Sequence, residues 1–209
     1  MSTLILGAFE PELTPLREFI SAFPTVTLAE TGIGITIAAA RTALAIDSIK
    51  PTSVIFIGSC GTSSPASGLL DIVVGTSTVL ANTASATISD SAFFPKGLSC
   101  RLPAGEELNA TARIVYGDKV THSAIYSPVA ISCSEELGLA LALQTGAHYE
   151  NLELFGVATA CAEANVPWIA FSAITNRINQ AGHDEWVKNH VSAAQKTAHF
   201  TKLFLEKWS

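Results

Sequence analysis

Tyr-Glu-Asn-Leu-Glu at 149–153, Gly-Val-Ala-Thr-Ala-Cys-Ala at 156–162 and the apolar run at 166–174 form the stretch that decides the fold. Small residues suit a helix that packs closely, and a continuous apolar run of this length is typical of a buried strand. Glu153 begins the predicted helix, and Asn176 follows the predicted strand. We therefore expect both side chains to reach one crevice at the rim of a sheet, where α/β folds bind ligands.

The rest of the chain alternates predicted strands and helices in the same way. Short apolar runs predict strands, and apolar residues repeated every three or four positions predict helices. The predicted strands are 3–6, 25–28, 53–57, 71–78, 79–81, 112–116, 122–127 and 168–173, with 71–78 and 79–81 forming a pair at a bend. One predicted helix starts near Pro11, and the others span 36–49, 134–145, 151–165 and 184–208. Ser134 is the predicted cap of the helix at 134–145. This alternation predicts an α/β fold and a single domain over residues 1–209.

Three further segments carry expectations of their own. Gly58-Ser59-Cys60-Gly61 follows a central predicted strand, and we interpret it as a turn whose N–H groups and Ser59 hydroxyl are able to contact a ligand. Residues 83–104 are small, polar and proline-bearing, which indicates a loop or irregular strand covering a pocket. The helix at 36–49 has Ala, Ile and Leu almost all round, which predicts burial against the sheet.

Composition limits the classes of partner. The chain has 209 residues, 48% of them hydrophobic, which is enough for one large core. A net charge of -6 and the lack of a basic cluster argue against a nucleic-acid partner. No apolar run approaches the roughly 18 residues of a membrane-spanning helix. The first residues lack the positive charge of a signal peptide, so we expect a soluble, cytoplasmic protein with no membrane partner.

The sequence gives no metal or cofactor signature. The cysteines show no Cys-x-x-Cys spacing, and we interpret all four as free buried thiols: Cys60, Cys100, Cys133 and Cys161. The five histidines contain no His-Glu-x-x-His pair. Gly32-Ile33-Gly34 lacks the third glycine of a dinucleotide-binding turn, since Ile37 stands in its place.

Each candidate site residue also has a purely structural explanation. Glu12 and Glu153 stand in the first turns of predicted helices, where an acid interacts favourably with the helix dipole. Asn176 suits a cap or turn, and Trp186 on an amphipathic helix suits a core position. Ser59 is not in a Gly-x-Ser-x-Gly motif, which argues against a hydrolase nucleophile. Taken singly, these residues do not identify an enzyme.

Taken in order, the same segments resemble the nucleoside phosphorylase and nucleosidase superfamily. The matching segments are 6–12, 31–34, 57–61, 71–74, 151–153 and 173–176. The resemblance runs from about Leu4 to about Phe204 and is weakest between Thr83 and Ala130. It implies a three-layer α/β/α sandwich with a central mixed twisted sheet, commonly a homodimer. The implied activity is cleavage of the N-ribosidic bond of a purine nucleoside, a small-molecule partner, with no cofactor.

Within the superfamily, the sequence is most similar to futalosine hydrolases and methylthioadenosine/S-adenosylhomocysteine nucleosidases. The resemblance implies that Glu12 activates the attacking water, Glu153 holds the ribose hydroxyls, and Ser59 lies beside the reacting sugar. The remaining implied substrate-binding residues are Phe9, Cys60, Gly61, Leu152 and Trp186. Two carboxylates suit this reaction because its transition state resembles a ribosyl cation, whose positive charge they favour.

Asn176 departs from the adenine-specific nucleosidases, which have aspartate at this position. A 6-oxopurine presents a carbonyl acceptor, to which the amide of Asn176 is able to donate while its oxygen accepts from protonated N7. Asn176 therefore favours hypoxanthine as the leaving base, and futalosine hydrolases share a tryptophan about ten residues later, as Trp186 is here. We predict cleavage of futalosine to hypoxanthine and the dehypoxanthinyl sugar, a step of menaquinone biosynthesis by the futalosine route.

Other departures bear on the nucleophile and on alternatives. Ser172 stands where the family commonly has arginine, and the loss of this cation favours water over phosphate. Arg177 and His183 lie near the predicted site, either facing a substrate carboxylate or solvated at the surface. An adenine nucleosidase acting on methylthioadenosine, S-adenosylhomocysteine or aminodeoxyfutalosine is one alternative function. A catalytically silent nucleoside-binding protein is another, against which the presence of both glutamates argues.

Overall fold

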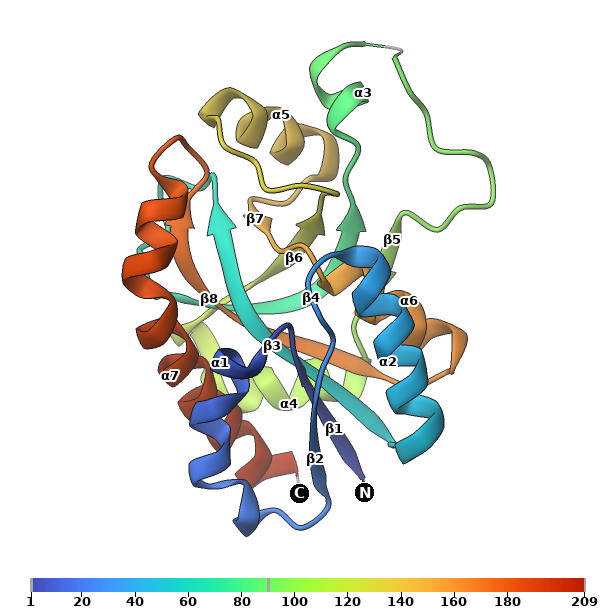
Figure 1. Ribbon diagram of the computed structural model, residues 1–209, viewed down its shortest axis with the longest axis vertical. Helices are drawn as coiled ribbons and strands as arrows, with labels where there is room; N and C mark the ends of the chain where they lie inside the picture. Colours follow the sequence, from blue (N-terminus) through green and yellow to red (C-terminus); the bar gives the residue numbers. More distant parts are fainter. Residues whose placement is uncertain (1, 90, 209) are drawn as a thin grey trace.

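A computed structural model describes residues 2–89 and 91–208 (Figure 1). Their strands form one eight-stranded sheet in the order β2-β1-β3-β7-β6-β4-β5, and β8 pairs with both β3 and β4. The strands are β1 (Thr3–Gly7), β2 (Val26–Glu30), β3 (Ser53–Thr62), β4 (Ile72–Leu80), β5 (Arg101–Pro103), β6 (Thr121–Ser127), β7 (Tyr149–Glu150) and β8 (Trp168–Arg177). The β3–β8 pair is parallel and the β4–β8 pair antiparallel, so the predicted mixed sheet is confirmed.

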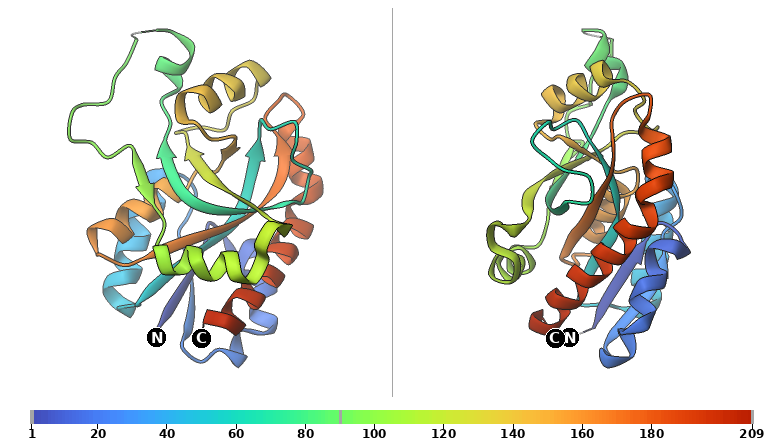
Figure 2. Two further views of the ribbon diagram at one scale, coloured as in Figure 1. Left: turned by 180° about the vertical axis from the view of Figure 1, so that it is seen from behind. Right: turned by 90° about the vertical axis from the view of Figure 1, so that its left-hand side faces the viewer.

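Helices cover both faces of this twisted sheet (Figure 2). They are α1 (Glu10–Leu13), α2 (Ile35–Ile49), α3 (Thr83–Thr87), α4 (Glu106–Tyr116), α5 (Glu135–Thr145), α6 (Leu154–Glu163) and α7 (Gly182–Trp208), with the 3-10 helices η1 (Thr14–Glu18), η2 (Ile20–Ala22) and η3 (Gly117–Lys119). One core cluster joins α2 and α6 to the sheet, and another joins α1, α4 and α7 to it. The predicted three-layer α/β/α sandwich is confirmed.

The small residues of α6 allow it to lie against α2. A Cβ on Gly156 would be 2.1 Å from the carbonyl oxygen of Ile35, so only glycine permits this approach. The helix begins later than predicted, at Leu154, because Tyr149–Glu150 form β7 and Asn151 caps the helix start. Asn151 Oδ1 accepts hydrogen bonds from the N–H groups of Glu153 (3.0 Å) and Leu154 (2.8 Å).

The turn predicted at Gly58–Gly61 is wrong, because β3 continues through it to Thr62. Strand β8 pairs with β3 in parallel through this segment, so the two glycines are part of a ladder and not of a turn. Asn176 therefore lies within β8 rather than after it. The register shifts so that Cys60 pairs with Ile174 and Gly61 with Asn176, which leaves Thr175 as the extra residue of a bulge. Such a bulge redirects the side chains that follow it.

Two other predicted strands are also corrected. Residues 112–116 belong to α4, whose Leu108, Ala112 and Tyr116 recur every four residues and are buried on one helix face. Residues 72–80 form one strand, β4, rather than a pair, with a register irregularity between Gly75 and Ser77 producing the bend. The remaining predicted strands correspond to observed ones, with ends displaced by a few residues.

The predicted helices are present in the structure, although the N-terminal one is shorter, α6 begins later, and the outer face of α2 is exposed. The helix starting near Pro11 is a single turn, α1, that passes into the 3-10 helices η1 and η2. The predicted cap of α5 is confirmed, since Ser134 Oγ accepts from Leu137 N–H at 3.1 Å. Helix α2 is only partly buried, with Ile37 and Leu44 exposed. None of the described helices is long and apolar enough to cross a membrane.

The segment 83–104, predicted as a loop or irregular strand covering a pocket, contains α3 and β5, and Figure 1 shows the chain at 91–99 extending away from the sheet. None of its described residues lines the cavity beside Glu12. The prediction of four buried thiols is right for Cys60 and Cys161, whereas Cys100 is partly exposed and Cys133 exposed. All four thiols are free.

Candidate active site

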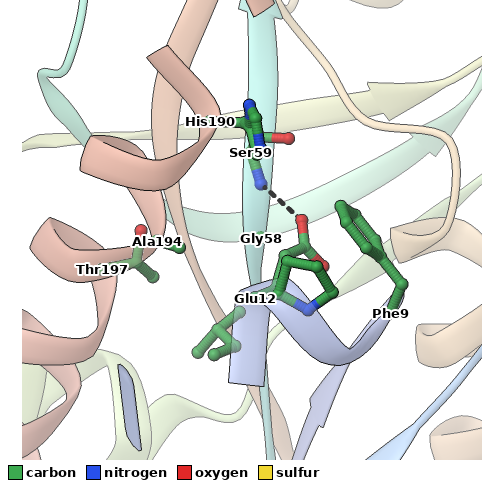
Figure 3. A pocket seen from close by; sticks show the side chains of 9 residues that line it. Phe9, Glu12, Gly58, Ser59, His190, Ala194 and Thr197 are labelled. Atoms are coloured by element: carbon green, nitrogen blue, oxygen red, sulfur yellow. Dashed lines mark hydrogen bonds between the residues drawn. The ribbon is translucent and has the colours of Figure 1, made fainter. Parts of the chain in front are cut away.

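Glu12 lies just beyond the end of β1, next to the middle of β3. The β1–β3 ladder ends at Leu6 and Phe56. Beyond that point the Glu12 carboxylate bridges the two chain segments by accepting hydrogen bonds from both. Its Oε2 accepts from Ala8 N–H at 2.7 Å. Its Oε1 accepts from Ser59 N–H at 3.2 Å, the hydrogen bond dashed in Figure 3. The residue is only 8% exposed. Burial raises the pKa of Glu12 to about 8; the Ala8 N–H opposes this shift, and the charge of Glu153 adds to it.

Glu153 stands at the start of α6 but does not cap it with its side chain. Its Oε1 accepts from Gly34 N–H at 2.9 Å, and its Oε2 accepts from Asn151 Nδ2 at 3.1 Å. Gly34 has a φ of 90°, a backbone conformation that favours glycine. Burial raises the pKa of Glu153, and the Gly34 and Asn151 donors oppose that shift. Each carboxylate oxygen keeps a lone pair for a further donor.

Ser59 connects the two carboxylates. Its N–H donates to Glu12, and its carbonyl oxygen accepts from Asn151 Nδ2 at 3.1 Å, the same amide nitrogen that donates to Glu153. Its hydroxyl accepts from Trp186 Nε1 at 3.4 Å. One residue of β3 therefore links α1, the β7–α6 turn and α7.

Aromatic rings of Phe9, Trp186 and His190 pack together beside Ser59 of β3. The Phe9 and Trp186 ring centroids are 6.3 Å apart, and His190 stacks on Trp186 at 4.7 Å. His183 lies on the same helix, with its ring centroid 6.1 Å from that of Trp186. In Figure 3 the ring of Phe9 lies beside the Glu12 carboxylate.

A narrow cavity of about 10 Å³ opens beside Glu12. It is lined by Phe9, Pro11, Glu12, Ile57, Gly58, Ser59, His190, Ala194 and Thr197. This volume holds about one water molecule. None of these lining residues is a lysine or arginine.

Asn176 lies on β8, where it pairs with Gly61, two residues after Ser59 on β3. Its Oδ1 accepts from the Thr175 hydroxyl at 2.8 Å, and its Nδ2 donates to the Arg177 carbonyl at 3.0 Å. The carbonyl is only an acceptor, which fixes the orientation of the amide. Gly61 makes room for it, because a Cβ there would be 3.1 Å from Asn176 Nδ2. One N–H and one lone pair of the amide remain for a ligand.

The other predicted residues are placed less centrally. The Cys60 side chain is buried in the core, which leaves only its backbone for a ligand, and Leu152 is half-buried in the β7–α6 turn. Ser172 is fully buried, and its hydroxyl has no hydrogen-bond partner among residues 2–89 and 91–208. Arg177 is half-buried, and its guanidinium donates to the carbonyls of Ser64 and Ser67.

Sequence reasoning missed several residues of this site. His190, Ala194 and Thr197 line the cavity from α7. His190 follows Trp186 by four residues, so helical periodicity places the two on one face and was the available signal. Asn151 was predicted only as part of the matching segment 151–153, although asparagine before a helix is a recognised cap signal. Within residues 2–89 and 91–208, no group of three or more His, Cys, Asp or Glu is arranged to hold a metal ion.

Comparison with known families decides the family. A model described as the phosphorylase superfamily matches residues 16–206. This chain belongs to the phosphorylase superfamily. The match covers every element named above except β1, α1, the first two residues of η1 and the last two residues of α7, so the superfamily assignment extends over nearly the whole fold. Comparison with proteins of curated function gave no match.

Solved structures share the fold of this phosphorylase-superfamily chain at low sequence identity. A futalosine hydrolase of Helicobacter pylori is 20% identical with a TM-score of 0.90, covering 99% of this chain and 97% of its own. The 5'-methylthioadenosine/S-adenosylhomocysteine nucleosidase of the same organism is 19% identical with a TM-score of 0.89, covering 99% and 98%. The nucleosidase from S. pneumoniae, solved with a transition-state inhibitor, is 16% identical with a TM-score of 0.89, covering all of both chains.

Proposed function

We propose that this protein is a nucleosidase that hydrolyses the N-ribosidic bond of a purine nucleoside, with futalosine as the favoured substrate. The observation that carries the proposal is a buried carboxyl group, Glu12, beside a cavity with room for one water. A second buried carboxyl group, Glu153, is joined to it through Ser59 and Asn151. The structures named as nucleosidases or hydrolases share this fold, which supports the same class of reaction.

The proposed mechanism assigns one role to each polar group. Glu12 in its carboxylate form takes a proton from the attacking water, for which a pKa near the working pH is suitable. Glu153 accepts hydrogen bonds from the ribose hydroxyls with its free lone pairs. Both negative charges favour the positive charge that develops on the ribose ring. The base departs as the neutral purine because its N7 takes a proton from solvent water, and Asn176 donates to the purine oxygen while its own oxygen accepts from that N7–H.

Water is favoured over phosphate as the nucleophile by the charges around the cavity. A phosphate ion would require cationic or several N–H donors. The lining residues include no lysine or arginine, Ser172 replaces the arginine common in the family, and the Arg177 guanidinium is directed to loop carbonyls. The N–H of Ser59 is engaged by Glu12.

A substrate panel tests the proposed function. The protein is incubated with futalosine, aminodeoxyfutalosine, methylthioadenosine and inosine, with and without phosphate, and the free base is quantified. We expect release of hypoxanthine from futalosine at the same rate in both buffers. Preferential release of adenine would instead support the adenine nucleosidase alternative. Binding of a nucleoside without release of base would support the silent binding protein.

Asn176→Asp should shift the base preference toward adenine. The amide nitrogen that donates to a 6-oxo group becomes an oxygen, which suits the 6-amino group of adenine. A buried mismatched pair costs about 1 to 3 kcal/mol, which predicts a change of roughly 5- to 150-fold in the ratio of kcat/KM for futalosine and its 6-amino counterpart. The two substrates differ only at the base, so the ratio isolates this contact.

Asn179→Asp is the matched control for this change. Asn179 lies three residues away, and its Oδ1 accepts from Ala181 N–H, a contact that aspartate retains. The control should leave the ratio unaltered. Wild-type protein that cleaves the 6-amino substrate at least as fast, or an Asn176→Asp variant with the wild-type ratio, would exclude the 6-oxopurine argument.

We also propose that the protein forms a homodimer through the outer face of α2. Ile33 precedes the helix and is 65% exposed, and Ile37 and Leu44 follow on the same face at 47% and 71%. Exposed apolar residues aligned in this way are typical of an interface, and a two-fold dimer would pair the stripe with itself. Light scattering should give twice the chain mass, and a monomeric mass at micromolar concentration would rule the dimer out.

A further inference from the structure

Asn151 uses all of its polar capacity inside the site. It is 6% exposed. Its Oδ1 accepts from two N–H groups at the start of α6, those of Glu153 and Leu154. Its Nδ2 donates to Ser59 O and to Glu153 Oε2, both at 3.1 Å. One half of the amide therefore caps a helix, while the other half holds a carboxylate against β3.

We propose that Asn151 is a positioning residue that fixes the orientation of the Glu153 carboxylate and keeps it charged for the ribose hydroxyls. The inference rests on the proposed function, because it concerns how Glu153 meets a riboside. The Nδ2 amide group is the decisive part of the side chain. Without it, Glu153 Oε2 loses its hydrogen-bond donor at a buried position, where an unpaired charge is costly. Gly34 N–H holds only the other oxygen.

The groups that hydrogen-bond to the Glu153 carboxylate are neutral donors, Gly34 N–H and Asn151 Nδ2, and no cation is among them. Glu12 on α1 is like-charged and raises the cost of ionising the pair. On β7, Glu150 is turned to Ser132, whose N–H it accepts at 3.0 Å. Cys60 on β3 has a pKa raised by burial and remains a neutral thiol. Arg41 on α2 lies against Gly32.

Asn151→Asp separates the two halves of the side chain. An aspartate oxygen still accepts from the N–H groups of Glu153 and Leu154, so the helix cap is preserved. The oxygen that replaces Nδ2 faces Ser59 O and Glu153 Oε2, which places acceptors against acceptors and two carboxyl groups in contact. Such a pair shares one proton and cannot present a fully charged Glu153 to the ribose.

The test compares a purine riboside with its 2'-deoxy counterpart in wild-type protein and the Asn151→Asp variant. A hydrogen bond to a charged group is worth a factor of roughly 10 to 150, so kcat/KM for the riboside should fall by about that factor. The deoxy substrate lacks the 2'-hydroxyl and so makes one contact fewer with Glu153, and its kcat/KM should therefore fall by a clearly smaller factor than that of the riboside. A loss of packing alone would lower both rates equally.

Asn82→Asp is the matched control. Asn82 is the N-cap of α3, on an element outside the candidate site, and its Oδ1 accepts from the N–H groups two and three residues later, those of Ala84 and Ser85, which is the spacing of the Asn151 contacts. It should change neither rate. Should Asn151→Asp fail to fold, Asn151→Ser keeps a capping oxygen, lacks the amide donor, and should show the same unequal loss.

The outcomes distinguish this inference from the proposed function. Equal losses on both substrates, or no loss on the riboside, would overturn the role of Asn151 while leaving the nucleosidase intact. A wild-type protein that cleaves no purine nucleoside would overturn both.

Discussion

Glu12→Gln is expected to lower kcat by roughly 10²- to 10⁴-fold while leaving nucleoside binding within a few fold of wild type. Glutamine cannot take a proton from water, but it retains the shape of the side chain. One of its atoms becomes a donor facing the N–H of Ala8 or Ser59, so some stability is lost as well. Steady-state kinetics together with equilibrium binding of the nucleoside separate the two effects.

The pH dependence provides a second signature of the same residue. Because the pKa of Glu12 is raised to about 8, the active carboxylate form grows as the pH passes that value, and kcat/KM should rise with it. Glu12→Gln should lose this rise. The sign for stability is opposite: the folded protein holds this proton more tightly than the unfolded chain, so the stabilisation present at acidic pH is lost as pH rises from about 4.5 to 8.

Glu10→Gln is the control for Glu12. It lies on the same short helix, but its carboxylate is exposed and paired with Arg17 at 2.8 Å. Exposed pairs of this kind contribute little, so activity and its pH profile should remain those of wild type. Near-normal turnover in Glu12→Gln would remove Glu12 from the mechanism.

Glu153→Gln is expected to lower kcat/KM for ribosides by roughly 10- to 150-fold, the value of a hydrogen bond to a charged group. The ribose hydroxyls bind this carboxylate most strongly when the sugar becomes cationic. Glutamine also places a donor against either Gly34 N–H or Asn151 Nδ2. The kinetic constants are measured alongside the melting temperature, so that loss of fold is not mistaken for loss of contact.

Glu163→Gln supplies the comparison on the same helix. Glu163 is exposed at the end of α6, so its replacement should alter neither rate nor melting temperature. If Glu153→Gln lowers only the melting temperature and the folded protein remains fully active, the Glu153 carboxylate stabilises the start of α6 and does not bind the substrate.

The layers of the fold were predictable because they depend on local patterns. Apolar runs such as 53–57 and the helical period of 184–208 survive in the structure, as does the Ser134 cap. Residues 112–116 were mistaken for a strand because their short apolar run fits either period; the preceding Glu106-Glu107 and Leu108 indicate the helix. Glycines at 58 and 61 resemble a turn until the neighbouring strand is known.

The site depends on contacts that no local pattern specifies. The N–H of Ser59 reaches Glu12 across 47 positions of sequence, and Gly34 reaches Glu153 across 119. The bulge at Thr175 sets where Asn176 lies, and it exists only in the pairing of β8 with β3. The sequence resemblance named Glu12, Glu153 and Asn176, whereas the connecting role of Asn151 required the geometry.

Hydrolysis of futalosine in ¹⁸O-labelled water, in buffer free of phosphate, tests the central claim most directly. Water attacking the ribose carbon should place one labelled oxygen in the sugar product and none in the hypoxanthine, as measured by mass spectrometry of both products. Release of base only when phosphate is added, with a sugar phosphate as the product, or no release of base from any purine riboside in labelled water, would contradict the account.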